Sequence, residues 1–385
     1  MLTRLWLSGR CFECDVERIQ PSPGGWVVKT RARRYFRFDT AAVTLLRRVM
    51  ALQSPDLDDP ACATLARFVE RRLIPLGIYR DATDSGARVA ACTTSGAMRW
   101  QHELLSARQV RPLAAMLARL YAPWLLWPLL ALCMAVHAGH ALTGTARLAY
   151  HDLLCYTPAE LLLLVGVALG RGLLHELGHA AACWRLTGSV GAIGGGVFLA
   201  TPVLYCDVSD IHLLPRRQKA LVGLAGAAMD IVALALLLAV GGAHIGVLKV
   251  YWLSMLAVLL NLLPFYRNDG YWVLNDLAGT DDMLRHAMRA CRQGGARSID
   301  WIVVGFMAAC LAGMAALAAA FAVDFGPQQI AEAVVQGPSL GGAVLAMVTA
   351  LQYAALVFAL FNLAKALQRT GVRFISPPQG PLDGP

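Results

Sequence analysis

The stretch RGLLHELGHAAACW, residues 171–184, places two histidines and a glutamate in one of the most apolar parts of the chain. On a helix, residues four apart lie about 40° apart around the axis and one turn along it, so His175 and His179 face the same way and are able to share one metal ion. Glu176 is displaced by about 100°, which suits a base acting on a water at the metal better than a ligand. Zinc fits this set because it accepts imidazole nitrogen and carboxylate oxygen and keeps one position open in catalytic sites.

Histidines inside a membrane bundle also serve as hydrogen-bonded packing residues. This interpretation is kept for His137 and His140, whose spacing indicates no more than an inward stripe. Three ionisable groups within one helical turn need a shared partner, so the sequence favours a metal site at His175, Glu176 and His179.

A third ligand has to come from another part of the chain, and NLLPFYRNDGYW, residues 261–272, offers Asp269. Pro264 precedes this residue and Gly270 follows it, so a helix is expected to break here and let the carboxylate turn toward the metal. The sequence therefore predicts one zinc ion per chain, with Asp269 joining the two histidines.

These two motifs resemble those of the site-2 protease family of intramembrane zinc metallopeptidases. The resemblance rests on H-E-x-x-H at 175–179 and on N-x-x-P-x-x-x-x-D-G from Asn261 to Gly270, in the family's order and with one further span between them. It covers about residues 159–277. It implies three zinc ligands, a catalytic base and a residue near the bound substrate, namely His175, His179 and Asp269, then Glu176, then Asn261.

Within that family the chain is most similar to the branch associated with bacterial peptide maturation and secretion. The similarity lies in residues 205–230 and 269–277 and in a small N-terminal module like the peptide-binding PqqD-type fold. No segment resembles a PDZ domain, which argues against the branch that trims anti-sigma factors. Asn268 and Ala227 depart from the family pattern, in which an aromatic residue often precedes the Asp-Gly pair and a proline often follows the Ala-Gly pair.

Residues 188–202, GSVGAIGGGVFLATP, are rich in glycine and lie between the second and third predicted spans. They lack the lysine of a P-loop, so a phosphate cradle is not indicated. A tight, flexible loop and a re-entrant strand both remain open. The resemblance favours a strand whose edge pairs with an extended substrate, in which case Gly194, Gly195 and Gly196 contact that substrate.

Composition indicates a membrane protein. Of the 385 residues, 57% are hydrophobic and 15% are charged, whereas soluble domains carry roughly 25% charged residues. The predicted fold is an all-α polytopic membrane protein with about six transmembrane helices. Each span is an apolar stretch able to cross a ~30 Å hydrocarbon layer, at residues 121–143, 159–184, 220–241, 247–265, 301–323 and 341–364.

The distribution of basic residues sets the expected orientation, because Lys and Arg are retained on the cytoplasmic side. Arg147 is the single basic residue in segments 144–158, 242–246 and 324–340, whereas segments 206–219, 266–299 and 365–385 are rich in them. Both termini are therefore expected to be cytoplasmic, and the resemblance implies a bacterial inner membrane. This orientation brings the histidine pair and Asp269 to the same cytoplasmic depth.

The net charge of +9 resides mostly before residue 120. A nucleic-acid-binding surface would give a similar charge, but six spans favour an anionic inner leaflet or an acidic peptide as the partner, and no nucleic acid is expected. Ten cysteines are scattered without a repeating spacing, which does not resemble a disulfide framework. For the single C-x-x-C pair, Cys11 and Cys14, two reduced thiols are favoured over a zinc knuckle.

Residues 1–85 are predicted to form a small α+β, winged-helix-like cytoplasmic module. GWVVKT and RRYFRF are expected to pair as a hairpin, and helices are expected after Asp39 and at Asp59-Pro60. A peptide-docking role and a plain cytoplasmic cap both remain open. The rest of the chain is divided into a linker and interfacial lead-in, a transmembrane metallopeptidase domain and a cytoplasmic tail, at 86–120, 121–368 and 369–385.

The expected function is hydrolysis of a peptide bond in a membrane-associated or precursor peptide, in peptide maturation or export, with a peptide exporter as a partner. A protease that releases a membrane-tethered signalling or transcription regulator is the alternative within the same family. Two alternatives come from other classes. One is a membrane scaffold or immunity factor with a relic zinc site, and the other is a metal transporter, which would not need Glu176 beside a ligand.

Overall fold

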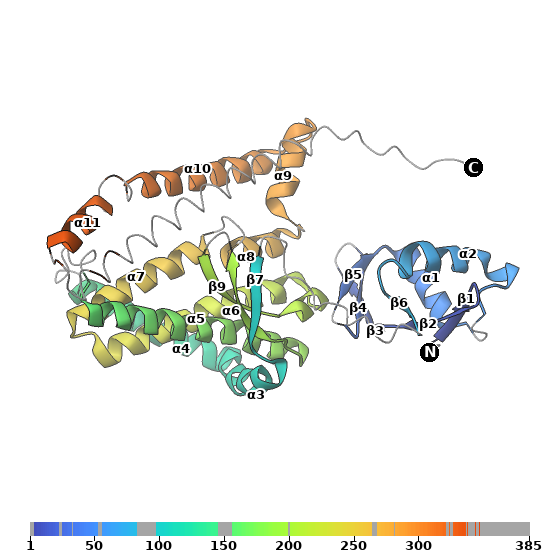
Figure 1. Ribbon diagram of the computed structural model, residues 1–385, viewed down its shortest axis with the longest axis horizontal. Helices are drawn as coiled ribbons and strands as arrows, with labels where there is room; N and C mark the ends of the chain where they lie inside the picture. The colour runs from blue at the N-terminus through green and yellow to red at the C-terminus, as the bar shows by residue number, and fades with distance from the viewer. Residues whose placement is uncertain are drawn as a thin grey trace.

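The computed structural model shows a mostly helical chain with three small antiparallel sheets (Figure 1). The structure describes residues 4–22, 25–32, 34–52, 56–82, 98–144, 156–198, 201–263, 268–280, 282–320 and 326–335. It also describes the single residues 323, 337, 343 and 346.

The first 82 residues form a module of two sheets and two helical segments. The strand orders are β1-β2-β6 and β3-β4-β5. The predicted hairpin is confirmed, because β4 and β5 pair antiparallel with Trp26 opposite Phe38. The bounds are β1 Arg4–Leu7, β2 Arg10–Cys14, β3 Val16–Ser22, β4 Gly25–Thr30, β5 Tyr35–Phe38, β6 Tyr79–Asp81, α1 Thr40–Met50, η1 Pro60–Cys62, α2 Ala63–Phe68 and η2 Val69–Leu73.

Both helix starts predicted in this module are confirmed. Asp39 caps α1 by accepting a hydrogen bond from the backbone N–H of Ala42 at 2.6 Å. Asp59 accepts one from Ala61 at 2.9 Å, with Pro60 in the first turn. The second helix does not run evenly, because it changes from 3-10 to α to π geometry between η1 and η2.

The region predicted as a linker and lead-in contains regular structure. Strand β7, Met98–Leu105, pairs with the glycine-rich strand β8, Ile193–Phe198, and helix α3 follows over Ala107–Leu117. The sequence of β7 has little strand propensity of its own. Pairing with a distant strand forms it, a tertiary effect that local composition does not reveal.

Four helices are long and apolar enough to cross a membrane, and they confirm the first four predicted spans as candidates. They are α4 Pro123–Gly144, α5 Pro158–Thr187, α6 Arg216–Gly241 and α7 Ile245–Leu262. The fifth predicted span coincides with helix α10, Ser298–Ala320. The sixth, 341–364, lies outside the described residues except for positions 343 and 346. Shorter helices complete the described chain, namely α8 Asp269–Ala278, α9 Met283–Arg292 and α11 Gly326–Val335.

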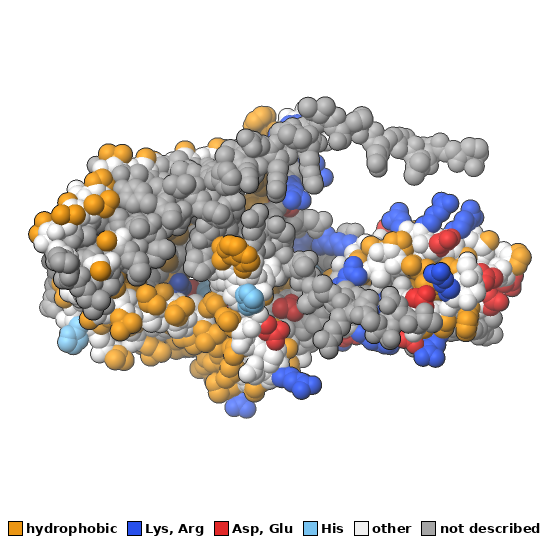
Figure 2. All heavy atoms as spheres, viewed as in Figure 1, with side chains coloured by type: hydrophobic (Ala, Val, Ile, Leu, Met, Phe, Trp, Pro, Cys, Tyr) orange, Lys and Arg blue, Asp and Glu red, His pale blue; other side chains and the backbone are white. Residues whose placement is uncertain are grey.

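The outward faces of the four candidate membrane spans carry large exposed apolar side chains. Figure 2 shows hydrophobic side chains over much of the visible helical body, whereas Lys and Arg side chains gather over the N-terminal module. Exposed large side chains include Trp124 and Trp127 near the start of α4 and Val240 near the end of α6. Such surfaces are stable against lipid, and aromatic residues at a helix end suit the membrane interface.

A buried ion pair joins the N-terminal module to the helical body. Lys29 on β4 lies 2.8 Å from Asp210, which is only 1% exposed. The hydroxyl of Tyr35 on β5 donates to the same carboxylate at 2.7 Å. Burial raises the pKa of Asp210, but the hydrogen bonds from Lys29 and Tyr35 outweigh it, so the pKa falls below its ordinary value. Asp210 belongs to η6, Ser209–Leu213, which follows strand β9, Thr201–Cys206.

Candidate metal centre

Three helices position the candidate site, namely α5, α6 and α8. Helix α5 begins with a capping box in which Thr157 and Glu160 each bond the other's backbone N–H, and it ends at Gly188 in the left-handed conformation. It packs against α6, which in turn packs against α8. The approach of α5 to α6 is very close at Gly178, where an added Cβ would lie 2.7 Å from the backbone oxygen of Ala225. Small residues permit such contacts between membrane helices.

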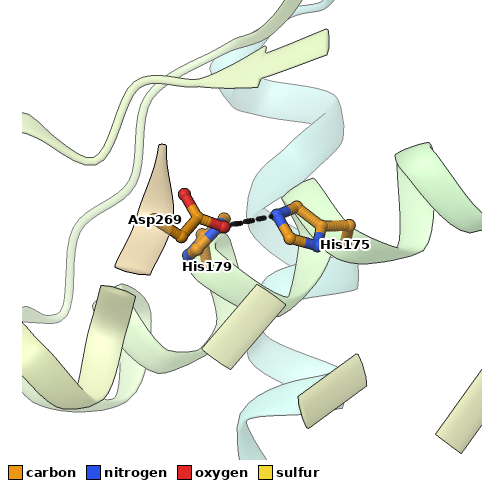
Figure 3. Close-up of side chains that lie close together, drawn as sticks. All are labelled: His175, His179 and Asp269. Atoms are coloured by element: carbon orange, nitrogen blue, oxygen red, sulfur yellow. Dashed lines mark hydrogen bonds and ion pairs between the residues drawn. The ribbon is translucent and has the colours of Figure 1, made fainter. Parts of the chain in front are cut away.

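The structure brings His175, His179 and Asp269 together (Figure 3). Oδ2 of Asp269 lies 2.9 Å from Nε2 of His175 and 3.4 Å from Nε2 of His179. The two Nε2 atoms are 3.1 Å apart. Both histidines are buried, and the Asp269 side chain is 24% exposed. Donor atoms of a tetrahedral zinc site with bonds of ~2.0–2.2 Å are separated by roughly 3.3–3.6 Å, close to these distances.

The hydrogen bonds of the two Nδ1 atoms show which ring nitrogens are available for a metal. Nδ1 of His179 donates to the backbone oxygen of Val222 at 2.7 Å, because a carbonyl only accepts. Nδ1 of His175 donates to Oδ2 of Asp230 at 2.8 Å. In the neutral rings both Nε2 atoms therefore carry lone pairs, and these point at each other and at a carboxylate oxygen. Three converging electron-pair donors repel one another unless a cation lies among them, so the residues fit a metal ion.

The Asp269 carboxylate is held in its charged form. Burial raises the pKa of Asp269, but its contacts with the His175 and His179 rings lower it by more, so the net result is a pKa well below its ordinary value. Asn261 adds a hydrogen bond from Nδ2 to Oδ2 of Asp269 at 2.7 Å. The structure thus places Asn261 on the third candidate ligand, a contact that the sequence did not predict. Its expected place beside a bound substrate stays a prediction.

Space for an ion is provided by Gly226 on α6. A Cβ added there would lie 2.5 Å from Nε2 of His179 and 2.6 Å from Nε2 of His175. Any other residue would place its Cβ atom against both nitrogens. The space between Gly226 and the two Nε2 atoms, here called the cradle, is therefore open because residue 226 is glycine.

Gly226→Ala is expected to lower bound zinc from about one ion per chain to well below one, because the methyl group fills the cradle. Alanine favours a helix over glycine by roughly 1 kcal/mol, so a loss of helix stability is not expected. The control is Gly170→Ala on α5, where an added Cβ meets nothing within 4 Å. Elemental analysis after loading with equimolar zinc and desalting measures the difference. Full zinc binding by Gly226→Ala would mean that the metal does not use this space.

Glu176 is half-buried on α5, one residue after the first histidine. The backbone N–H of Cys206, the last residue of β9, donates to its carboxylate. An added Cβ at Gly172, one turn earlier on α5, would lie 3.2 Å from the side chain of Leu204, so β9 runs close beside this face of the helix. The carboxylate is therefore fixed between the histidine pair and a strand.

The predicted substrate glycines lie in the middle of a sheet. Strand β8, which contains Gly194, Gly195 and Gly196, pairs with β7 on one edge and β9 on the other. An extended peptide joining this sheet would therefore have to meet β7 or β9, or displace one of them. The contact of the three glycines with substrate stays a prediction.

Sequence reasoning missed Asp230 and Arg171. Asp230 is fully buried on α6 and contacts both His175 and Arg171, whose Nη1 lies 2.8 Å from its Oδ1. The available signal was an aspartate within an apolar span, a position that is rare without a partner. Arg171 lies four residues before His175, so the two side chains share one face of α5.

The structure also gives the surroundings of His137 and of the C-x-x-C pair. His137 is a packing residue, since its ring bonds the Tyr251 hydroxyl at 2.9 Å and the backbone oxygen of Ile231 at 3.0 Å. Cys11 and Cys14 are both free thiols. They lie three residues apart on strand β2 and so face opposite sides of it, which does not suit a shared metal.

Comparison of the chain with protein-family models, with curated proteins and with solved structures gives no match.

Proposed function

We propose that this chain is an intramembrane zinc metalloendopeptidase of the site-2 protease type. The observation that carries the proposal is the convergence of two imidazole nitrogens and one carboxylate oxygen beside a second carboxylate, Glu176. The histidines and Glu176 lie on α5, a helix of membrane-spanning length, and Asp269 begins the short helix α8. Catalytic zinc sites use three protein ligands and an open position, and the proposed set provides this. A metal-transport site would have no use for Glu176 next to a ligand.

The chemistry follows from the separate roles of these residues. A zinc ion held by His175, His179 and Asp269 would lower the pKa of a bound water to about 7 and polarise the scissile carbonyl. Glu176 then takes a proton from the water as its oxygen attacks the carbonyl carbon. When the C–N bond breaks, Glu176 delivers that proton to the leaving amine nitrogen. The Cys206 N–H keeps the carboxylate in place for both transfers.

The proposed substrate is an extended segment of a membrane-associated or precursor peptide. A helical segment hides its carbonyls in hydrogen bonds, so it has to unwind before hydrolysis. The sheet β7-β8-β9 is the element beside Glu176 that offers backbone hydrogen bonds to an unwound strand. A role in peptide maturation, with a peptide exporter as partner, rests on the resemblance described above. Release of a membrane-tethered regulator is the alternative.

Zinc removal tests this function. The purified protein in detergent is treated with a chelator, desalted and incubated with a synthetic peptide library, and mass spectrometry reads the new termini. We expect cleavage by the zinc-loaded protein, its loss after chelation and its return on adding one equivalent of zinc. A zinc-loaded protein that produces no new termini would favour the scaffold or immunity factor, and cleavage that survives complete zinc removal would contradict the proposed chemistry.

The proposed topology places both termini in the cytoplasm of a bacterial cell, with the candidate site near the cytoplasmic face. Reporter fusions after residues 150 and 332 are expected to be external, and fusions after 215 and 285 cytoplasmic, because the loops rich in Lys and Arg stay inside. An external reporter at 285 would separate Asp269 from the histidines across the membrane and contradict the site.

A further inference from the structure

Asp230 is the most deeply buried charged residue beside the candidate metal centre. Its side chain is 0% exposed, and it lies on α6 within a candidate membrane span. An isolated carboxylate at such a position costs several kcal/mol, so it is retained only with partners. The structure gives it one cation and one imidazole N–H, and these come from the same face of α5.

The imidazole contact connects Asp230 to the metal site. Oδ2 of Asp230 accepts from Nδ1 of His175 at 2.8 Å, while Nε2 of the same ring points at Asp269. This bond fixes the proton on Nδ1 and the plane of the ring, so that the Nε2 lone pair is directed into the space beside Gly226. The corresponding nitrogen of His179 instead bonds a neutral carbonyl, the backbone oxygen of Val222. A carboxylate therefore orients the His175 ring, whereas a neutral carbonyl orients the His179 ring.

The second partner of the Asp230 carboxylate is the guanidinium of Arg171. Nη1 of Arg171 lies 2.8 Å from Oδ1 of Asp230 in an ion pair, and the arginine side chain is 19% exposed. Oδ1 has no aligned hydrogen bond among the described residues. Arg171 therefore acts mainly through charge, and Oδ2 is left to the histidine.

On the basis of the proposed zinc site, we propose that Asp230 is the positioning residue for His175: it fixes the tautomer and the orientation of the ring, while the ion pair with Arg171 holds the Asp230 carboxylate in place. Removing such an outer carboxylate typically lowers metal affinity by roughly 10- to 100-fold. Asp230→Asn keeps the shape and an acceptor oxygen but removes the charge. We expect its zinc dissociation constant to rise by about that factor, and the absorption spectrum of the cobalt-substituted protein to change.

The single variant also leaves Arg171 without its counter-ion, which by itself destabilises a buried site. The double variant Arg171→Met, Asp230→Asn removes both charges. We expect the metal-free double variant in detergent to be as thermally stable as the metal-free parent. Its zinc affinity should stay as weak as that of Asp230→Asn. Met229→Leu, a buried apolar change next to Asp230 on α6, is the control for general disturbance of that helix.

Zinc affinity is measured by competition with a chelator, with the parent protein first. The inference is overturned if Asp230→Asn binds zinc as tightly as the parent with an unchanged cobalt spectrum. It is also overturned if the double variant regains the parent's affinity, because the deficit then came from the unpaired arginine. A parent that binds no zinc overturns the proposed function as well as this inference, so the two failures are distinguishable.

Discussion

Replacing Glu176 with Gln is expected to leave zinc at about one ion per chain while peptide cleavage falls by at least ~10²–10⁴-fold, the usual contribution of a general base. The amide keeps the size of the side chain and its ability to accept from the Cys206 N–H. It cannot take the proton that the attacking water must lose. None of the three candidate ligands is changed, so metal binding should be unaffected.

The matched control is Glu70→Gln, which removes an exposed carboxylate from η2 of the N-terminal module. It should cleave the peptide library as the parent does. Metal analysis and mass spectrometry of new peptide termini, carried out on the same preparations, separate the two effects. Cleavage by Glu176→Gln at the parent's rate would exclude Glu176 as the base and with it the proposed mechanism.

Asp269→Ala has the opposite expected result, loss of the metal itself. Two neutral imidazoles would remain, and the proposed site would lose its only anionic ligand. Zinc per chain should fall from about one to near zero after desalting, and cleavage should be lost with it. The fold should persist, because Asp269 lies in the first turn of α8 while Asn268 provides the cap of that helix.

Asp276→Ala serves as the control on the same helix, since this carboxylate is outside the His175, His179 and Asp269 group. It is expected to keep its zinc. Full zinc content in Asp269→Ala would show that the third ligand lies elsewhere. The two variants must therefore differ, with Glu176→Gln metal-bound and inactive and Asp269→Ala metal-free and inactive.

Local signals predicted the four candidate spans and the residues that the structure brings together as His175, His179 and Asp269. The spacing of His175 and His179 requires only an unbroken helix, and α5 provides it. Four apolar stretches predicted the four candidate spans because hydrophobic length is a local property. Asp269 was identifiable because it follows a helix break and carries a charge beside an apolar segment.

Features that depend on tertiary pairing were not predicted. Strand β7 lies in a segment that the sequence predicts to be a linker, and it is a strand because it pairs with β8. The Arg171–Asp230 pair joins two helices whose contact the sequence does not encode locally. The space that Gly226 leaves between the two histidines depends on the packing of α6 on α5, so no local pattern in the sequence reveals it.

Zinc-edge X-ray absorption on the purified, zinc-loaded chain tests the central claim most directly. The account predicts one zinc per chain with two imidazole nitrogens at ~2.0–2.1 Å and oxygen in the remaining positions. The imidazole signal should disappear when His175 and His179 are both replaced by alanine. Sulfur at ~2.3 Å would indicate cysteine ligands instead, and that result, or a chain that holds no zinc, would contradict the account.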